Sequence, residues 1–425
     1  MANIRPFRAV RPKAELADKV AALPYDVFSR SEAAAYVKGR GLSFLNIDRP
    51  ETAFAPDHDM YADDVYDHAR ELYESWKREG IFIQDEEPCY YVYELCMDGR
   101  RQTGIGALSS VDDYLCGICK KHENTVEEKE RDRIRHVDSL SAQTGPIFLS
   151  YHHDLRIDAL VNEAKEQPPV YDIISEDGIG HRLWCISEKD KVERLTELFS
   201  ELPCTYIADG HHRAASAVKV ALKRREEESE AGESEATDRP FHEYDGFLSV
   251  LFPDTELRIY DYNRVVSDLS GYEPEGFLRK LAEYFDIRET EELMHPEHKF
   301  EIGMYLDHKS YMLRLKDRYA EERKGDPQRS LDVSVLQDLV LDPLLSIKDP
   351  RTDGRISFVG GIRGLSELVR MADDKTGDGS WAAAFAMYPT SMQELFSVAD
   401  AGLLMPPKST WFEPKLRSGF LIHEF

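Results

Sequence analysis

The stretch TYIADGHHRAAS, residues 205–216, decides the fold that we expect for this chain. Its first four residues favour an extended strand, and Asp209 with Gly210 supplies a tight turn. Beyond the turn, apolar residues return at helical spacing. The stretch therefore predicts a strand, a turn and a helix. The first helical turn then holds three polar side chains: His211, His212 and Arg213.

A helix start of this composition is suited to binding anions. The first backbone N–H groups of a helix are unpaired, and the helix dipole is positive at that end. Gly210 lets the backbone approach a phosphate closely, Arg213 can bind two phosphate oxygens, and either imidazole can donate a further hydrogen bond. We expect nucleotide phosphates to bind at four residues: Gly210, His211, His212 and Arg213.

Asp209 does not fit simple phosphate binding, because a bare carboxylate repels a phosphate. Three roles remain open for it: helix cap, metal ligand or general base. In the purely structural alternative, Asp209 caps the helix while the two histidines only pack. Two histidines and an arginine in one helical turn are more than a cap requires, so we favour a functional site.

A second polar cluster lies in KKHENTVEEKERDRIRHV, residues 120–137. Thr125 and Glu128 have the spacing of a capping box, which explains them without any function. The capping box does not explain His122 and Glu123, which lie just ahead of the predicted helix. We therefore take Glu123 as a candidate catalytic residue.

A third cluster is MPPKSTWFEPKLRSG, residues 405–419. Its prolines stiffen a loop, its aromatic residues supply flat apolar surface, and its cations stand in a strongly acidic chain. The segment is interpreted equally well as a nucleotide clamp or as a C-terminal segment that docks on a core. As a clamp, it would contact the nucleotide through Lys408, Ser409 and Thr410, and the substrate through Lys415.

Two further patterns are weaker phosphate signals. Arg131 and Arg135 share a face of the predicted helix, which can meet either a phosphate or a neighbouring carboxylate. Gly360 and Gly361 in SFVGG suit a phosphate loop, but such a pair more often marks a turn. For these two patterns we favour the structural interpretations.

The composition is that of an acidic globular protein. The 425 residues include 54 Lys and Arg against 80 Asp and Glu, a formal net charge of −26, with 42% hydrophobic residues. An acidic surface repels a phosphate backbone, so nucleic acid is not expected as a partner. The N-terminus has no apolar signal region, and no segment has the roughly 18 apolar residues that cross a bilayer. We expect a cytoplasmic protein that does not bind membranes.

Periodicity along the chain predicts an α+β fold in two domains. Residues 89–115 alternate as hairpin strands around the turn DGR, and a charged helix is expected near 125–142. The helix of the DGHHR stretch runs into an acidic low-complexity segment that we interpret as a linker. We place the boundary there, so that residues 1–238 form one domain and residues 239–425 the other. The second opens with FLSVLFPDTELRIYDYNRVV, interpreted as two strands around a turn.

These motifs carry a family resemblance. TYIADGHHRAAS resembles the G-x-x-R box of the ParB and sulfiredoxin superfamily, in the DGHHR form of its free-serine kinases. A longer pattern resembles the bacterial and archaeal family of unknown function numbered one thousand and fifteen, over nearly the whole chain. That pattern includes LPYDVFSRSEA, KHENT, LDVSVLQDLVLDPLL, SFVGG and MPPKSTWFEPKLRSG.

The resemblance implies a ParB/sulfiredoxin-like mixed α/β core in the first half, followed by a second α+β domain. The similar kinases transfer the terminal phosphoryl group of ADP or ATP to free L-serine. By that resemblance, the DGHHR loop would hold the nucleotide, and Asp209 would lie near the reacting groups with Mg²⁺. The kinases also use an upstream acid as base, for which we choose Glu123 by its position, with Asp26 next. His212 completes the predicted catalytic set, and His122 and Thr125 join Lys415 in substrate binding.

We therefore expect a small-molecule kinase that phosphorylates the hydroxyl of L-serine or a related amino acid. One alternative is a nucleotide-binding switch that transfers no phosphoryl group. A second is a metal hydrolase using His211, His212, His122 and Glu123, although adjacent histidines point in different directions from a helix start. The donor, the acceptor and the assembly state remain open, with a homodimer among the expectations.

Overall fold

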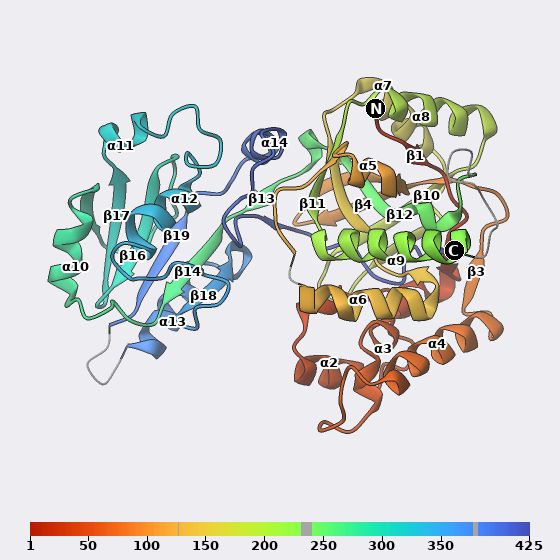
Figure 1. Cartoon of the computed structure of the whole chain (residues 1–425), viewed down its shortest axis with the longest axis horizontal. Helices are drawn as coiled ribbons and strands as arrows, with labels where there is room; N and C mark the ends of the chain where they lie inside the picture. Colours follow the sequence, from red (N-terminus) through yellow and green to blue (C-terminus); the bar gives the residue numbers. More distant parts are fainter. Residues whose placement is uncertain (126, 231–239, 377–380) are drawn as a thin grey trace. The chain divides into compact units, whose positions relative to one another are not determined.

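The computed structural model divides into two compact units (Figure 1). The first contains Met1–Leu257 together with Pro414–Phe425, and the second contains Arg258–Glu413. Each unit combines helices with sheets, so the predicted α+β class is confirmed. The structure describes four segments of the chain: residues 1–125, 127–230, 240–376 and 381–425.

The first unit is built on a nine-stranded mixed sheet. Its strands are β1 Ile4–Arg5, β4 Tyr90–Met97, β5 Arg100–Ser110, β6 Cys119–Lys120, β8 Ile147–Tyr151, β9 Tyr171–Ile174, β10 Gly180–Ile186, β11 Thr205–Asp209 and β12 Gly246–Pro253. They run in the order β6-β11-β8-β12-β5-β4-β10-β9, and β1 also pairs with β5. The pairs β6–β11 and β8–β12 are parallel, and the other neighbours are antiparallel. The sheet is therefore mixed, and its partners come from distant parts of the chain.

The predicted hairpin of residues 89–115 is confirmed for β4 and β5, which pair from Tyr91 opposite Gly106 to Met97 opposite Arg100, but its last five residues form helix α5 (Val111–Leu115) instead of strand. Asp98 and Gly99 form the turn with φ of 52° and 78°. Positive φ at both central residues is the requirement of the tight turn that matches strand twist. The DGR sequence therefore fixes this hairpin locally.

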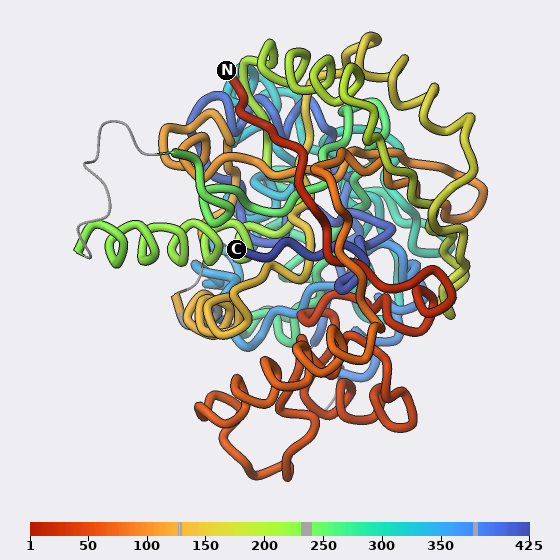
Figure 2. Tube along the Cα trace, turned by 90° about the vertical axis from the view of Figure 1, so that its right-hand side faces the viewer, coloured from red at the N-terminus to blue at the C-terminus, as the bar shows by residue number. Residues whose placement is uncertain are grey.

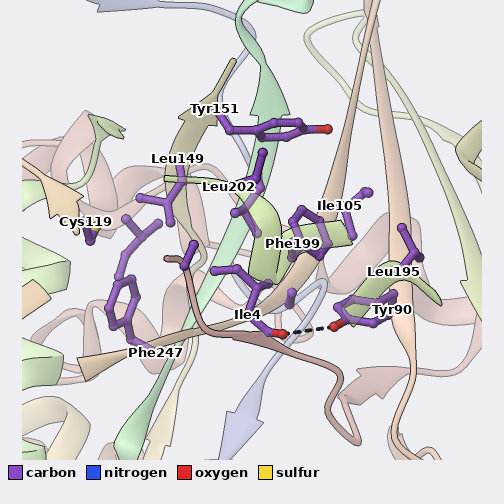
Figure 3. Packing of buried hydrophobic residues seen from close by; sticks show 14 of the residues in the cluster. Ile4, Tyr90, Ile105, Cys119, Leu149, Tyr151, Leu195, Phe199, Leu202 and Phe247 are labelled. Carbon is purple, nitrogen blue, oxygen red and sulfur yellow. Dashed lines mark hydrogen bonds between the residues drawn. The ribbon is translucent and has the colours of Figure 1, made fainter. Parts of the chain in front are cut away.

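One face of the sheet packs against three helices, α7 Leu155–Lys165, α8 Lys189–Glu201 and α9 His211–Glu230. Figure 3 shows part of the apolar cluster between them, in which the ring of Tyr151 of β8 lies 6.0 Å from the ring of Phe199 of α8. The Tyr90 hydroxyl donates to the Ile4 carbonyl at 3.0 Å, which satisfies the polar end of this buried ring. The start of α9 is thus anchored on a buried sheet.

Helices from the N-terminal region form a second layer of the first unit. They are α2 Arg30–Val37, α3 Leu45–Asp48 and α4 Asp63–Arg78, joined by α6 Glu127–Leu140. Helix α4 packs on α3 and α6, and α6 packs on α9. Figures 1 and 2 both place α2, α3 and α4, in red to orange, together at one end of this unit. Helix α6 therefore links this layer to α9.

The C-terminal segment, residues 414–425, docks on the first unit. Its strand β21 (His423–Glu424) pairs with β7 (Ala142–Gln143). Phe420 packs 5.0 Å from the ring of Tyr93. The docking interpretation of the third sequence cluster is confirmed for this segment.

The second unit is a six-stranded sheet with its own helices. The strands are β14 Tyr262–Val266, β15 Phe285–Thr290, β16 Glu301–Leu306, β17 Lys309–Leu315, β18 Ile356–Gly360 and β19 Ala383–Met387. Their order is β15-β17-β16-β19-β14-β18, with β13 (Ile259–Tyr260) and β20 (Trp411–Phe412) paired separately. The main helices are α10 Pro274–Leu281, α12 Asp332–Leu336, α13 Leu365–Lys375 and α14 Met392–Asp400. Helix α13 packs on the face of β14 that carries Val265.

The compact units have different bounds from the two domains that we predicted at residue 238. Strand β12 pairs with β5 and β8, so residues 246–253 belong to the first sheet, whereas β14 belongs to the second. The two strands of FLSVLFPDTELRIYDYNRVV therefore lie in different units. Most of the predicted acidic linker, residues 231–239, lies outside the described residues.

Candidate functional site

The site is centred on the junction between β11 and α9, as the sequence predicts. Strand β11 ends at Asp209, after a register shift against β8 between Ile207 and Asp209. Gly210 has φ of 95°, a conformation that glycine adopts without strain, and α9 begins at His211. The shift and the glycine together turn the chain sharply, which places the first backbone N–H groups of α9 beside the carboxylate.

Asp209 is held by two contacts. Its Oδ2 accepts a hydrogen bond from the Lys415 ammonium at 2.7 Å, and its Oδ1 accepts one from the Gly210 backbone N–H at 2.8 Å. Burial alone would raise the pKa of Asp209, but the charges of Lys415 and Arg213 outweigh it and hold this pKa well below its ordinary value. The Asp209 side chain remains 37% exposed. It is thus an ionised carboxylate that solvent or a ligand can reach.

Two histidines meet beside this acid. The rings of His122 and His211 lie 4.5 Å apart and nearly perpendicular, and the His122 backbone N–H points to Nε2 of His211 at 3.5 Å. Burial lowers the pKa of His211 well below its ordinary value, and the neighbouring His122 lowers it further. Both imidazoles are therefore neutral at pH 7, since burial also lowers the pKa of His122 to about 4.

His122 is an unusual member of the cluster. Its side chain is 2% exposed, and within the described segments neither of its ring nitrogens meets the geometry of a hydrogen bond. The backbone of Ile207 is close enough to raise the pKa of His122, against the larger effect of burial, and the ring keeps hydrogen-bonding capacity for a ligand or water. Glu123 follows it directly, with Oε2 4.0 Å from Nδ1 of His211. The predicted pair His122 and Glu123 is thus brought to the DGHHR loop.

His212 and Thr125 lie near another carboxylate, Glu130 of α6. Burial would raise the pKa of Glu130, but hydrogen bonds from Lys219 and Thr125 and the charge of His212 lower it. Glu130 is 4% exposed and forms an ion pair with Lys219. These contacts tie the start of α9 to α6. Catalytic and substrate roles for His212 and Thr125 remain predictions.

Arg213 points toward the loop that precedes β8. Its Nη1 donates to the Pro146 carbonyl at 2.9 Å. Burial opposes its charge, but the carboxylates of Asp26 and Asp209 raise the pKa of Arg213 above its ordinary value. A cavity of about 30 Å³, room for roughly one water molecule, is lined by Arg213 together with Tyr25, Gly145 and Ser418. Asp26, the second candidate base, is therefore electrostatically coupled to Arg213.

The predicted nucleotide clamp is divided between the two units. Lys415 belongs to the first unit, and Lys408, Ser409 and Thr410 belong to the second. The Ser409 hydroxyl donates to the Pro406 carbonyl at 2.5 Å, and the Ser409 carbonyl accepts from the Thr390 hydroxyl at 3.1 Å. Ser409 is thus engaged within its own loop, and nucleotide contacts by Lys408, Ser409 and Thr410 remain predictions.

The weaker phosphate signals have structural explanations. Arg131 pairs with Glu127 at 2.9 Å, and Arg135 pairs with Asp63. A Cβ at position 360 would lie 2.9 Å from the indole of Trp411, and one at position 361 would lie 2.0 Å from a carboxylate oxygen of Asp261. The paired glycines make room for these two side chains.

A match over residues 4–334 decides the family. The matching family is described as a protein of unknown function, DUF1015. The chain belongs to the DUF1015 family. A search of the curated proteins gives no match. No helix within the described segments is long and apolar enough to span a membrane.

Eight chains of solved structures are similar to this DUF1015 protein. SbnI with a C-terminal truncation, from Staphylococcus aureus, has 12% identity and a TM-score of 0.36, over 72% of this chain and 82% of its own. A conserved hypothetical protein from Pyrococcus furiosus has 14% identity and a TM-score of 0.32, over 74% and 93%. A free serine kinase in complex with AMP has 14% identity and a TM-score of 0.33, over 74% and 90%. Likeness at this level assigns no activity to this chain.

The sequence analysis missed a second cavity in the first unit of this DUF1015 chain. It has a volume of about 660 Å³, and its wall includes Arg417 and Asp177, which pair at 2.5 Å. Arg417 also donates to Nε2 of His181, a fully buried residue, at 3.2 Å. The LRSG segment of the third cluster could have indicated this cavity, because its Arg417 lines it. The next residue, Ser418, lines the smaller cavity beside Arg213.

Proposed function

We propose that this chain is a small-molecule kinase that transfers a phosphoryl group from ATP or ADP to the hydroxyl of free L-serine or a related amino acid. The observation that carries the proposal is the ionised carboxylate of Asp209 at the start of α9, paired with Lys415 at 2.7 Å. An acid and a cation beside a helix N-terminus provide the three elements of phosphoryl transfer: a base, a counter-charge and a phosphate seat.

The phosphate seat is the first turn of α9. The backbone N–H groups after Gly210 are directed out of the helix end, and the dipole favours a negative charge there. An arriving phosphate would attract the Lys415 ammonium, which then bridges carboxylate and phosphate. Arg213 adds positive charge from the same helical turn. This arrangement removes the repulsion that an isolated Asp209 would cause.

Mg²⁺ fits this site in a limited way. Among the described residues, no group of three or more His, Cys, Asp and Glu side chains could hold a metal ion. Mg²⁺ is usually bound by one or two carboxylates together with substrate phosphates, so Asp209 can serve as its protein ligand. When bound, the ion would neutralise charge on the phosphates. The same finding weighs against the metal hydrolase alternative, which needs a histidine cluster.

In this proposal the acceptor hydroxyl binds on the side of His122 and Glu123. The neutral ring of His122 can hydrogen-bond a hydroxyl without adding charge. A carboxylate, that of Asp209 or Glu123, takes the hydroxyl proton as the oxygen attacks the terminal phosphorus and the shortened nucleotide leaves. Thr125 lies near Glu130 at the edge of this region.

One experiment separates the kinase from both alternatives. The purified full chain is incubated with Mg²⁺, ATP or ADP labelled on the terminal phosphate, and a pool of amino acids. The kinase yields a labelled amino acid, and omission of single amino acids then identifies the acceptor. A nucleotide switch binds the label but yields no product, and a hydrolase releases only inorganic phosphate. Either of the last two results contradicts the proposal.

A further inference from the structure

The second unit contains a buried arginine at the centre of its sheet. Arg264 lies in β14, opposite Phe358 of β18 and Phe385 of β19. The residue is 3% exposed. It lies on the opposite face of β14 from Val265, the residue that packs under α13. The guanidinium therefore lies on the face of the sheet opposite to α13.

Arg264 binds only carbonyl oxygens among the described residues. Its Nη2 donates to the Lys408 carbonyl at 3.0 Å, and its Nη1 donates to the Tyr262 carbonyl. In the part of the chain that the structure describes, no carboxylate lies within ion-pair distance of it. Burial lowers the pKa of Arg264 to about 10, so the group is still charged at neutral pH. A full positive charge is thus buried with partial compensation.

The other buried arginines of the described residues all pair with a carboxylate, unlike Arg264. Five arginines are buried among the described residues: Arg49, Arg133, Arg264, Arg323 and Arg417. Four of them pair with a carboxylate, at distances between 2.5 and 2.8 Å: Arg49 with Glu51, Arg133 with Asp132, Arg323 with Asp338 and Arg417 with Asp177. Burying an unpaired charge is strongly unfavourable in general. The chain has 80 Asp and Glu, so the lack of a carboxylate partner for Arg264 among the described residues indicates that its charge has another use.

A second cation and three aromatic rings surround the same place. The Lys408 ammonium lies 5.8 Å from the centre of the Tyr262 ring, and Arg264 lies 5.6 Å from the centre of the Phe358 ring. The Tyr262 ring is 5.0 Å from Trp411 and 5.9 Å from Phe358. Lys408 is exposed, and in the described segments no carboxylate lies within ion-pair distance of it. Two cations on aromatic faces thus lie on one side of the sheet.

We propose that Arg264 and Lys408 form an anion-binding site on the second unit, which takes the carboxylate or phosphate group of a small molecule. Arg264 supplies N–H groups beyond the two that bind carbonyls, and Lys408 supplies a second, exposed charge. Burial beside the Phe358 ring limits access of water to Arg264, which strengthens the attraction of its charge for an anion. These residues belong to the second unit and the α9 helix start belongs to the first, and the inference does not depend on the kinase proposal.

The test measures how anions stabilise the full chain. Unfolding temperature and calorimetric binding are recorded with millimolar inorganic phosphate or acetate, against chloride at the same ionic strength. An Arg213→Ala background weakens any phosphate site at α9, so the remaining effect reports on the second unit. A response to phosphate, to acetate or to both supports the proposal and identifies the group that is bound. The absence of any response beyond chloride overturns it.

Variants assign the response to residues. Arg264→Met keeps the packing volume and removes the charge, and we expect it to abolish the anion-dependent rise. Lys408→Met is an exposed change that should fold, and we expect anion affinity to fall at least about tenfold. Arg355→Met removes a cation that already pairs with Asp353 at 2.7 Å, so it should leave the response unchanged. If Arg264→Met lowers the unfolding temperature equally in all anions, or if Lys408→Met binds as wild type does, Arg264 only fastens the loop and the proposal fails.

Discussion

The ammonium of Lys415 lies 2.7 Å from the carboxylate of Asp209, although 206 positions separate the two residues in the chain. Asp209 is delivered by the end of β11, and Lys415 by the C-terminal segment docked on the first unit. The pair explains how a carboxylate can occupy a helix start that is suited to phosphate. Its charge is balanced by a cation that a phosphate can also use.

Replacing Lys415 with Met should move the acid limb of the activity profile to higher pH. Lys415 is the leading contributor that lowers the pKa of Asp209, and burial would raise this pKa once the cation is lost. A base with a lowered pKa stays ionised to lower pH, so the wild type keeps activity at a pH where the variant has lost it. Profiles of kcat against pH measure the shift.

Lys223→Met is the matched control for this shift. It removes an ion pair with Asp138 from the same helix α9, on a side chain that is 50% exposed, and it should leave the profile in place. An unmoved acid limb in Lys415→Met would show that Asp209 is not the titrating base.

Arg213→Ala should weaken nucleotide binding about ten- to hundredfold, because a charge-assisted contact is typically worth about 1.5–3 kcal/mol. Arg131→Ala serves as control, since Arg131 pairs with Glu127 on the exposed surface of α6. Calorimetric titration with ADP and ATP measures both. Unchanged affinity in a folded Arg213→Ala chain would remove the phosphate role from this turn.

Two substitutions distinguish the upstream acids. Glu123→Gln should lower turnover by at least about a hundredfold while nucleotide affinity holds, as expected for loss of a general base. Asp26→Asn should have a smaller effect on turnover and act mainly on nucleotide affinity, because Asp26 is coupled to Arg213. If Glu123→Gln is silent and Asp26→Asn slows turnover, the base is Asp26 and our assignment is wrong.

Gly419→Ala tests whether docking of the C-terminal segment positions Lys415. Gly419 has φ of 72°, and a Cβ there would lie 2.3 Å from the ring of Phe44. We expect a loss of about 1–3 kcal/mol in unfolding free energy together with reduced turnover. Gly178→Ala is the control, because that position also has positive φ but has no atom within 4 Å of the added Cβ. Equal effects of the two variants would show that only backbone strain matters.

Local chemistry explains which parts of the fold were predictable. The DGR turn specifies its own hairpin, since Asp98 and Gly99 are the two central residues of the turn and both have the positive φ that it requires. The strand, turn and helix around Gly210 follow from twelve contiguous residues in the same way. Such elements depend on neighbours in the chain, so periodicity and turn residues suffice.

Long-range pairing explains what the sequence left undetermined. Strand β12 follows an acidic run that is typical of a linker, yet it pairs with β5 and β8, more than ninety positions earlier in the chain. The pairing of Asp209 with Lys415 could not be predicted either, because Lys415 reaches Asp209 only when the C-terminal segment docks on the first unit. The charge of Arg264 also carried no sequence signal, since a lone arginine in a strand gives no sign of its missing carboxylate.

The most direct test of the kinase account is the rate of labelled product formation by Asp209→Asn, measured beside its nucleotide affinity. The substitution keeps the size of the side chain and an oxygen for the Gly210 N–H, and it removes the charge that Lys415 balances. We predict that turnover falls at least about a hundredfold while nucleotide affinity is held or improved. Full turnover in this variant would contradict the account, because Asp209 would then only cap the helix.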